Sequence, residues 1–339
     1  MILYLGNKLS AHGLSPTSVE LLAPRISKLG FEVISRSSIK NQAFRLADML
    51  LSIIRYWNSK PVVLIDTYST SAFWYAVACG RLCSLLGLNY IPILRGGDLP
   101  ARLSKNPKIA NKLFLKSFSN IAISNYMKQE FEIRNLPVRT IHNSIDISIY
   151  PFIQRSIIKP RLLWVRSFHT IYNPFMAIDV LEQISLKHPE ATLCMVGPEK
   201  DHSLKECREL VRNKKLNVTF TGKLTKEQWI NLSQLYDIFI NTTNVDNTPV
   251  SVMEAMALGM PVISTDAGGV PHLIDDGVNG ILVPTHNSGK MVGAIEELLL
   301  DQQTVLNMSK EARKTALQWD WEIVAKQWKE VFNDAGIES

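Results

Sequence analysis

The chain has 339 residues, of which 46% are hydrophobic and 20% charged, and its formal net charge is +6. This length favours two domains, each large enough to bury its own core. The mild positive charge suits anionic ligands, an acidic membrane surface or nucleic acid, and it does not choose among them. No apolar run approaches the about 18 residues that a spanning helix needs, and the opening MILYLGNKLS is too short for a signal peptide. We therefore expect a soluble or peripheral protein.

The four cysteines, Cys79, Cys83, Cys194 and Cys207, form neither a C-x-x-C pair nor a zinc-binding pattern. Cys79 and Cys83 lie four residues apart in an apolar helical pattern, which favours buried free thiols. Free thiols are typical of a reducing compartment, so we expect a cytoplasmic protein.

In the first half of the chain, short apolar runs alternate with helical patterns, which predicts a parallel sheet with helices on both faces. Ser15-Pro16 has the character of a helix start. We expect strands at Ile2–Leu5, Phe31–Ser35, Val62–Asp66, Tyr90–Leu94, Ile121–Ser124 and Arg139–Ile141. We expect helices near Pro16–Leu29, Gln42–Trp57, Ser71–Leu86, Pro107–Phe118 and Tyr126–Arg134.

Two loops of this half follow strands at their carboxyl ends, where ligand-contacting loops of such sheets occur. The first contains His12 and Gly13, and a plain surface loop explains it equally well. The second contains Arg95, Gly96 and Asp98, for which a structural ion pair between Arg95 and Asp98 is the alternative. No G-x-G-x-x-G follows the first strand, so a dinucleotide site has little support.

Lys108, Lys112 and Lys116 recur at four-residue spacing in the helical pattern Pro107–Phe118. The ordinary interpretation is a solvated helix face. A contact with an anionic membrane surface or an anionic acceptor is the more specific alternative.

Periodicity lapses between His142 and Pro160, and then the alternation of strands and helices restarts. We expect two doubly wound α/β domains, 1–150 and 151–317, with the ligand in the cleft between them. Residues 318–339 contain a further amphipathic pattern, Trp321–Phe332, as a candidate to pack back across the domain junction. The strands expected in the second domain are Leu162–Val165, Thr192–Val196, Val218–Thr221, Ile238–Asn241, Val262–Thr265 and Ile281–Val283.

The stretch DNTPVSVMEAMALGMPVISTDAGGVP places Asp246 before an expected helix and Glu254 inside it. Thr248 suits the N-cap and the proline after it suits the first helical position, while Gly259 suits the C-terminal end. A helix N-terminus offers unpaired amides and a positive dipole end, which bind phosphate. Two flanking acids suit a ligand with hydroxyls on both sides of the phosphate, such as a nucleotide sugar.

Further candidates follow other strands of the second domain. Arg166 comes just after an apolar strand, and a guanidinium binds diphosphate oxygens two at a time. Tyr172 and Asn173 then precede the next helix. Gly268 and Gly269 after Val262–Thr265 favour a backbone surface for ligand hydroxyls over a simple tight turn. The chain contains no Asp-x-Asp and no histidine spacing typical of ligands, so we expect no metal site.

Together these motifs resemble the retaining glycosyltransferases of family 4, which have the GT-B fold of two Rossmann-like domains facing a central cleft. The densest match, Asn241–Pro284, contains the two acids, Glu-Ala-Met-Ala-x-Gly-x-Pro-Val, Gly-Gly and Gly-x-x-Gly-x-Leu-Val in order. Weaker matches extend over nearly the whole chain: Ser124-Asn125-Tyr126, Ile141 to Asp146, and Val165 to Phe168.

The resemblance implies a role for each matched residue. Glu254 would bind the donor ribose, and Asp246, where the family usually has Glu, would face the transferred sugar. The amides of Val250 and Ser251 would hold phosphate and sugar, and Arg166 would contact the diphosphate. The resemblance implies a front-face transfer with retained configuration, without cofactor or nucleic acid. The donor would be a nucleotide sugar and the acceptor a carbohydrate or a lipid-linked molecule. The reaction would belong to polysaccharide or glycoconjugate synthesis at the cytoplasmic side.

This chain departs from the family pattern at two positions. The usual Lys after the Arg is replaced by Tyr172-Asn173-Pro174, and the usual His-Gly of the first domain is Arg95-Gly96. We hypothesise that Arg95 supplies the missing positive charge across the cleft. A pseudoenzyme that only binds nucleotide sugars, and an epimerase or phosphorylase on the same fold, are the alternatives.

Overall fold

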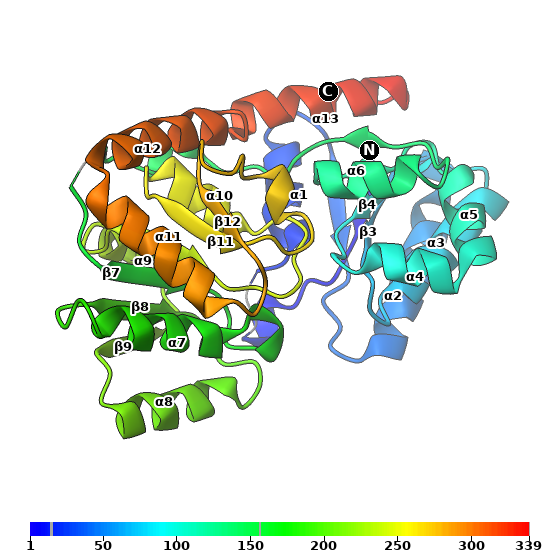
Figure 1. Ribbon diagram of the computed structural model, residues 1–339. Helices are drawn as coiled ribbons and strands as arrows, with labels where there is room; N and C mark the ends of the chain where they lie inside the picture. Colours follow the sequence, from blue (N-terminus) through cyan, green and yellow to red (C-terminus); the bar gives the residue numbers. More distant parts are fainter. Residues whose placement is uncertain (14–15, 156, 339) are drawn as a thin grey trace. The chain divides into compact units, whose positions relative to one another are not determined.

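The computed structural model describes residues 1–13, 16–155 and 157–338, which form two compact units (Figure 1). The first unit is Met1–Asn143 together with Glu322–Ser339, and the second is Ser144–Trp321. The chain therefore leaves the first unit at residue 143, seven residues before the expected boundary, and returns to it for the C-terminal helix.

The first unit is built on a six-stranded parallel sheet in the order β2-β1-β3-β4-β5-β6. The apolar runs form its centre because strands covered on both faces must be apolar throughout. The strands are β1 (Ile2–Leu5), β2 (Val33–Arg36), β3 (Val62–Thr67), β4 (Tyr90–Leu94), β5 (Ile121–Ala122) and β6 (Arg139–Thr140). The helices are α1 (Ser18–Ser27), α2 (Gln42–Tyr56), α3 (Phe73–Leu85), α4 (Leu99–Lys105), α5 (Pro107–Leu115) and α6 (Asn125–Glu132).

Helices α1 and α4 differ most from the expectation, and α5 ends at Leu115 rather than at Phe118. Helix α1 begins at Ser18, with Thr17 and Glu20 forming a capping box, so Pro16 lies outside it. The expected start signal at Ser15 lies outside the described residues. Helix α4 was not expected, because its Leu99-Pro100 start and short length give little helical periodicity.

The second unit repeats the architecture with the strand order β12-β11-β10-β7-β8-β9, all parallel. Each expected strand is present with ends within one residue. The strands are β7 (Arg161–Val165), β8 (Thr192–Val196), β9 (Val218–Gly222), β10 (Ile238–Asn241), β11 (Val262–Thr265) and β12 (Ile281–Val283). The helices are α7 (Pro174–Ser185), α8 (Ser203–Lys214), α9 (Lys226–Ser233), α10 (Val250–Ala257), α11 (Ser288–Leu300) and α12 (Gln302–Leu317).

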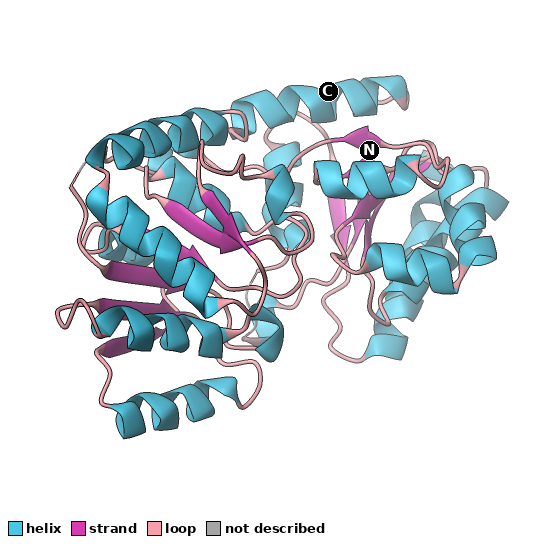
Figure 2. Cartoon of the chain, viewed as in Figure 1, coloured by secondary structure: helices cyan, strands magenta, loops and turns pink. Residues whose placement is uncertain are grey.

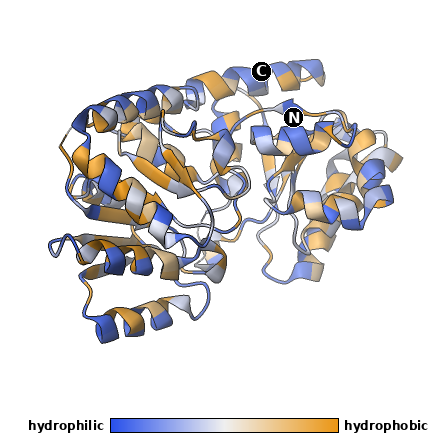
Figure 3. Ribbon diagram, viewed as in Figure 1, coloured by the Kyte–Doolittle hydropathy of each residue, from blue (hydrophilic) through white to orange (hydrophobic). Residues whose placement is uncertain are grey.

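Helices flank the strands in each unit (Figure 2). Hydrophilic and hydrophobic residues alternate along these helices (Figure 3). The last helix, α13 (Trp321–Asp334), buries Trp328 and Phe332 in the first unit, where the ring of Phe332 lies 5.0 Å from that of Phe31. Short 3-10 turns, η1 (Ser10–His12), η2 (Trp57–Ser59), η3 (Ile147–Ile149), η4 (Thr170–Tyr172) and η5 (Val270–His272), join the larger elements.

The four cysteines are buried and free, which confirms their expected state. In the part of the chain that the structure describes, no helix is long and apolar enough to cross a membrane.

Candidate functional site

The N-terminus of α10 presents unused hydrogen-bond donors. The helix begins at Val250 with Pro249 as N-cap, one residue later than expected, so Thr248 is not the cap. Within the described residues, neither the amides of Val250 and Ser251 nor the buried hydroxyl of Ser251 has a hydrogen-bond partner. Because a buried hydroxyl without an acceptor costs free energy and the free amides of a helix N-terminus attract negative charge, this end of α10 is suited to bind an anion.

Arg166 and Asp246 form an ion pair on the approach to this helix. Arg166 follows β7 and Asp246 lies in the loop after β10, its neighbour in the sheet, so both lie at the carboxyl edge. Each side chain is 15% exposed. Burial lowers the pKa of Arg166, while the nearby Tyr172, whose ring lies 4.4 Å from the guanidinium carbon, opposes this shift. Arg166, which we expect to bind the diphosphate, and Asp246, which we expect to face the sugar, are thus in direct contact.

Gly268 and Gly269 hold the loop that carries Asp246. The amide of Gly269 donates to the carbonyl oxygen of Asp246 at 3.0 Å. A Cβ at Gly268 would lie 2.2 Å from that oxygen, and one at Gly269 would lie 1.8 Å from the carbonyl oxygen of Asn247. The glycines are therefore required by close backbone packing. The preference for a free backbone surface is wrong for the Gly269 amide, which is bonded within the protein.

Glu254 is 4% exposed and has two partners that the sequence did not indicate. The hydroxyl of Tyr150 donates to its Oε1 at 2.8 Å, and Lys226 forms an ion pair with the same oxygen. A buried carboxylate needs such partners because its desolvation is otherwise expensive. Lys226 also lies 5.7 Å from the ring of Trp229 and remains 46% exposed. Lys226 follows strand β9 closely, as Arg166 follows β7, and this position in the sequence could have identified it as a site residue.

Asn173 has a structural function in this site. Its backbone is left-handed (φ 47°), and its side chain caps α7 by accepting from the amide of Met176 at 3.3 Å. The hydroxyl of Thr242 lies 2.9 Å from the carbonyl oxygens of both Tyr172 and Asn173, and its single proton is shared between them. Tyr172 therefore faces Arg166 from a loop that is tied to the end of β10.

In the first unit, Arg95 is held in a buried network. Its Nε donates to Asp66 at 3.1 Å, its Nη1 to Asn143 at 2.8 Å and its Nη2 to the hydroxyl of Tyr4 at 3.3 Å. The alternative pairing of Arg95 with Asp98 is wrong, because Asp66 is the acid in contact with the guanidinium. Burial raises the pKa of Asp66 although Arg95 opposes this shift. The pKa of Arg95 is raised despite burial, by Tyr4 and Asp66.

The other candidates of the first unit lie in loops. Gly96 packs so closely on the β3 loop that a Cβ would lie 2.3 Å from the amide nitrogen of Ser69. His12 is exposed, with its Nε2 2.8 Å from the carbonyl oxygen of Ser38, and Gly13 ends η1 with φ 80°. Asp98 precedes α4 without capping it. A ligand-contacting role for these residues stays a prediction.

The second unit thus brings together a helix N-terminus, a buried cation and two acids at one edge of a parallel sheet. Amides and a guanidinium can hold a diphosphate, and carboxylates can accept hydrogen bonds from hydroxyls. Among the described side chains, no group of three His, Cys, Asp or Glu residues lies close enough to hold a metal ion.

Solved structures that are similar to this chain over both of its units identify its fold. The HepE protein of Anabaena, crystallised in complex with UDP, is 18% identical, with a TM-score of 0.77 over 98% of this chain and 100% of that one. The sucrose-phosphate synthase of Thermosynechococcus elongatus is 15% identical, with a TM-score of 0.79 over 98% of both chains. Two doubly wound parallel sheets with this likeness define the GT-B fold of glycosyltransferases.

Part of the sequence matches a family model. Residues 155–315 match the model of the glycosyl transferases group 1. The D-inositol 3-phosphate glycosyltransferase of Corynebacterium kroppenstedtii is 25% identical over 51% of this chain and 40% of its own length. The sulfoquinovosyl transferase SQD2 of Arabidopsis thaliana is 30% identical over 43% of this chain and 28% of its own. The chain matches less than half the length of either relative.

Proposed function

We propose that the protein transfers a sugar, with retention of anomeric configuration, from a nucleotide diphosphate sugar to an acceptor hydroxyl. The observation that carries this proposal is the set of unpaired donors at the N-terminus of α10, with Ser251 among them, beside the Arg166–Asp246 pair. Diphosphate on these donors would leave one acid, Asp246, for the sugar and a second, Glu254, for the ribose hydroxyls.

In the proposed reaction, negative charge grows on the departing diphosphate while the sugar becomes oxocarbenium-like. Arg166 and the amides of Val250 and Ser251 would stabilise that charge once the donor has bound. A leaving phosphate oxygen would take the proton of the acceptor hydroxyl as that hydroxyl attacks from the same face. The bond between sugar and diphosphate breaks as the new glycosidic bond forms, so atoms and charge balance without a nucleophile from the protein.

Arg166 must exchange one partner for another when the donor binds. The guanidinium, paired with Asp246 in this structure, would turn to the diphosphate and release the carboxylate toward the sugar. Tyr172 would keep the guanidinium in place by its ring, 4.4 Å away. An aromatic ring thus occupies the position at which the family pattern has a second cation.

The donor and acceptor are proposed at the level of class. UDP is the first nucleotide to test because HepE, of the same fold, was crystallised with UDP-glucose. One relative, from Campylobacter jejuni and 26% identical over 51% of this chain, is named for a sugar-diphospho-undecaprenol acceptor. A carbohydrate or lipid-linked acceptor at the cytoplasmic side of the membrane, in polysaccharide or glycoconjugate synthesis, fits this likeness. We propose no role for nucleic acid.

The test measures release of nucleotide diphosphate from UDP- and GDP-sugars with a panel of sugar and lipid-linked acceptors. Arg166→Ala should lower turnover about a hundred- to a thousand-fold, the usual cost of losing one such donor. Arg161→Ala is the matched control, because Arg161 pairs with Asp237 at 2.6 Å at the opposite end of the same strand. Tight nucleotide-sugar binding without turnover, for every donor and acceptor, would indicate a binding protein without catalysis.

We further propose that no metal ion and no cofactor take part, and that the guanidinium of Arg166 and the amides of α10 would hold the diphosphate instead. Turnover should therefore persist after the protein has been dialysed against EDTA and assayed in its presence. The measurement is the initial rate with and without added magnesium or manganese. A rate that disappears with EDTA and returns with manganese would contradict this part of the proposal.

A further inference from the structure

The positive charge of the chain is concentrated in one segment. Between Thr67 and Gln129 there is a single acid, Asp98, while the rest of the chain has one more acid than it has lysines and arginines. The whole excess of +6 therefore comes from this part of the first unit. Its cations are Arg81, Arg95, Arg102, Lys105, Lys108, Lys112, Lys116 and Lys128.

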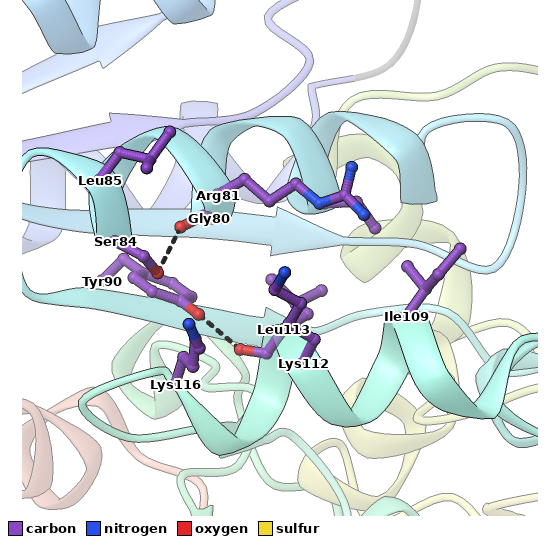
Figure 4. Close-up of a pocket in the computed structure, with 10 residues that line it drawn as sticks. Gly80, Arg81, Ser84, Leu85, Tyr90, Ile109, Lys112, Leu113 and Lys116 are labelled. Atoms are coloured by element: carbon purple, nitrogen blue, oxygen red, sulfur yellow. Dashed lines mark hydrogen bonds between the residues drawn. The ribbon is translucent and has the colours of Figure 1, made fainter.

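Three of these cations surround a pocket of about 420 Å³ between α3, α5 and the start of β4 (Figure 4). Arg81 comes from α3, and Lys112 and Lys116 from α5 and its C-cap. The walls are apolar, with Ile109 and Leu113 among them. In the part of the chain that the structure describes, no ion pair is formed by Arg81, Lys112 or Lys116. Their charges are thus available to a ligand.

The pocket is a built feature of the fold. Gly80 lets α3 approach α5, since a Cβ there would lie 2.6 Å from Cδ1 of Leu113. The buried hydroxyl of Tyr90 donates to the carbonyl oxygen of Leu113 at 2.6 Å, which ties α5 to the strand. Tyr90 opens β4 and Arg95 follows its other end. About 15 Å of strand therefore separates this pocket from the ligand edge of the sheet.

Apolar side chains are exposed around the pocket. Leu85, which lines it, is 83% exposed, and Leu115 and Phe118 on the α5 side are 57% and 39% exposed. On the α2 side of α3, Trp57 is 46% exposed, and its Nε1 donates to the carbonyl oxygen of Leu86 at 3.0 Å. A soluble phosphate would need the cations alone, whereas exposed Leu, Phe and Trp beside cations are typical of a surface that enters a lipid interface.

We propose that this pocket binds the anionic headgroup of a bilayer phospholipid, with Leu85, Leu115 and Phe118 entering the interface around it. Arg81, Lys112 and Lys116 would contact the phosphate, and the apolar walls would take the glycerol and first acyl carbons. Lys108 lies on α5 outside the pocket lining and would add to the long-range attraction only. The proposal concerns a site other than the one assigned to the donor and holds whether or not the protein transfers sugar.

The test is co-sedimentation of the full chain with vesicles of phosphatidylcholine alone or with phosphatidylglycerol added. Binding should require the anionic lipid and weaken as salt is raised. Lys112→Gln/Lys116→Gln should weaken partition about 25-fold, since each cation near such a surface contributes about five-fold, or about 1 kcal/mol. Lys205→Gln/Lys310→Gln, with the same loss of charge in exposed lysines of the second unit, is the matched control.

Two variants test the pocket itself at constant charge. Ser84→Trp should fill it and weaken vesicle binding, and Leu85→Ser should weaken the apolar contact, while unfolding temperature and nucleotide binding stay unchanged. Equal binding by Ser84→Trp and the parent would overturn the headgroup assignment. If inorganic phosphate or glycerol phosphate raises the unfolding temperature but the protein does not bind vesicles, the ligand of the pocket is a soluble phosphate and the lipid assignment is wrong. Loss of sugar transfer alone bears on the proposed function and not on this site.

Discussion

At the scale of single residues, Arg95 and Asp66 are a buried pair in which each group depends on the other. Arg95→Ala would leave the carboxylate of Asp66 buried without its cation, which we expect to cost about 3–5 kcal/mol in the free energy of unfolding. Chemical denaturation of the parent and the variant measures this cost. A loss below about 1 kcal/mol would contradict the pairing at 3.1 Å as a structural contact.

The pH dependence of this variant has a definite sign. Burial already raises the pKa of Asp66 in the folded state, and removal of Arg95 takes away the main opposing attraction. A carboxyl whose folded pKa is raised stabilises the protein at low pH and loses that contribution as pH rises through the folded pKa. Stability of Arg95→Ala should therefore fall, relative to the parent, from about pH 4 upward. Arg95→Ala/Asp66→Asn, which removes the charge, should lose this dependence.

The hypothesis that Arg95 supplies a positive charge to the reaction stays a prediction. Its bonds to Tyr4, Asp66 and Asn143 already give it a structural role in the loop after β4. Sugar transfer by Arg95→Ala should therefore be compared only after its stability is restored by Asp66→Asn.

Asp246 is the residue at which binding and turnover should separate. Asp246→Asn removes the charge that competes for Arg166, so affinity for a nucleoside diphosphate should rise or stay the same. Turnover should fall about a hundredfold or more, because the carboxylate is assigned to the transferred sugar. Calorimetric titration with UDP and GDP, beside initial rates, measures both quantities. Weaker binding of both nucleotides would show that Asp246 supports the structure of the binding site and does not compete with the diphosphate for Arg166.

At the scale of elements, the loop between β11 and η5 positions the N-terminus of α10 through backbone packing. Gly269→Ala places a Cβ where only 1.8 Å separates it from the carbonyl oxygen of Asn247, so the Asp246 loop must move. We expect nucleotide affinity to fall at least about tenfold, because a shift of about 1 Å suffices to lose oriented contacts.

Gly293→Ala is the control for this prediction. Gly293 lies inside α11 with no atom within 4 Å of its added Cβ, so alanine should stabilise the helix by about 0.5–1 kcal/mol. Thermal unfolding and nucleotide titration of both variants separate the two effects. Equal nucleotide affinity in Gly269→Ala and the parent would mean that the loop tolerates displacement.

Helices and strands were predictable from sequence where the apolar periodicity agreed with residues that typically begin or end such elements. The strand at Ile238–Asn241 and the helix end at Gly259, with φ 73°, follow from an apolar run and a C-terminal glycine. The start of α10 was displaced by one residue because Thr248 and Pro249 both suit a helix entrance. Partners of the buried acids could not be read, since Tyr150 lies 104 residues from Glu254 and Arg95 lies 29 from Asp66. Such pairs are set by strand order, which local pattern leaves open.

At the scale of the whole molecule, α13 belongs to the first unit although it follows the second in the chain. It buries Val324, Trp328, Val331 and Phe332, and Phe332 packs on Phe31. Removing residues 322–339 should unfold the first unit, because loss of several such side chains at about 2–5 kcal/mol each exceeds the stability of an ordinary domain.

Hydrogen exchange measures this outcome strand by strand. Amides of β1, β3 and β4 should lose protection in the shortened chain, while those of β7, β8 and β10 keep it. The second unit should survive because Trp321, whose amide donates to the carbonyl oxygen of Ile145 at 3.0 Å, is retained. Full protection in both sheets would show that α13 contributes little to the core of the first unit.

The return of the chain to its first unit has a consequence for the order of synthesis. A ribosome delivers Met1–Asn143 first, yet the residues that cover Phe31 come only with the last turns of α13. The second unit, continuous from Ser144 to Trp321, can complete its core while the earlier unit still exposes apolar surface. We expect the half that is made first to be the half that is finished last, and to depend on chaperones during that interval.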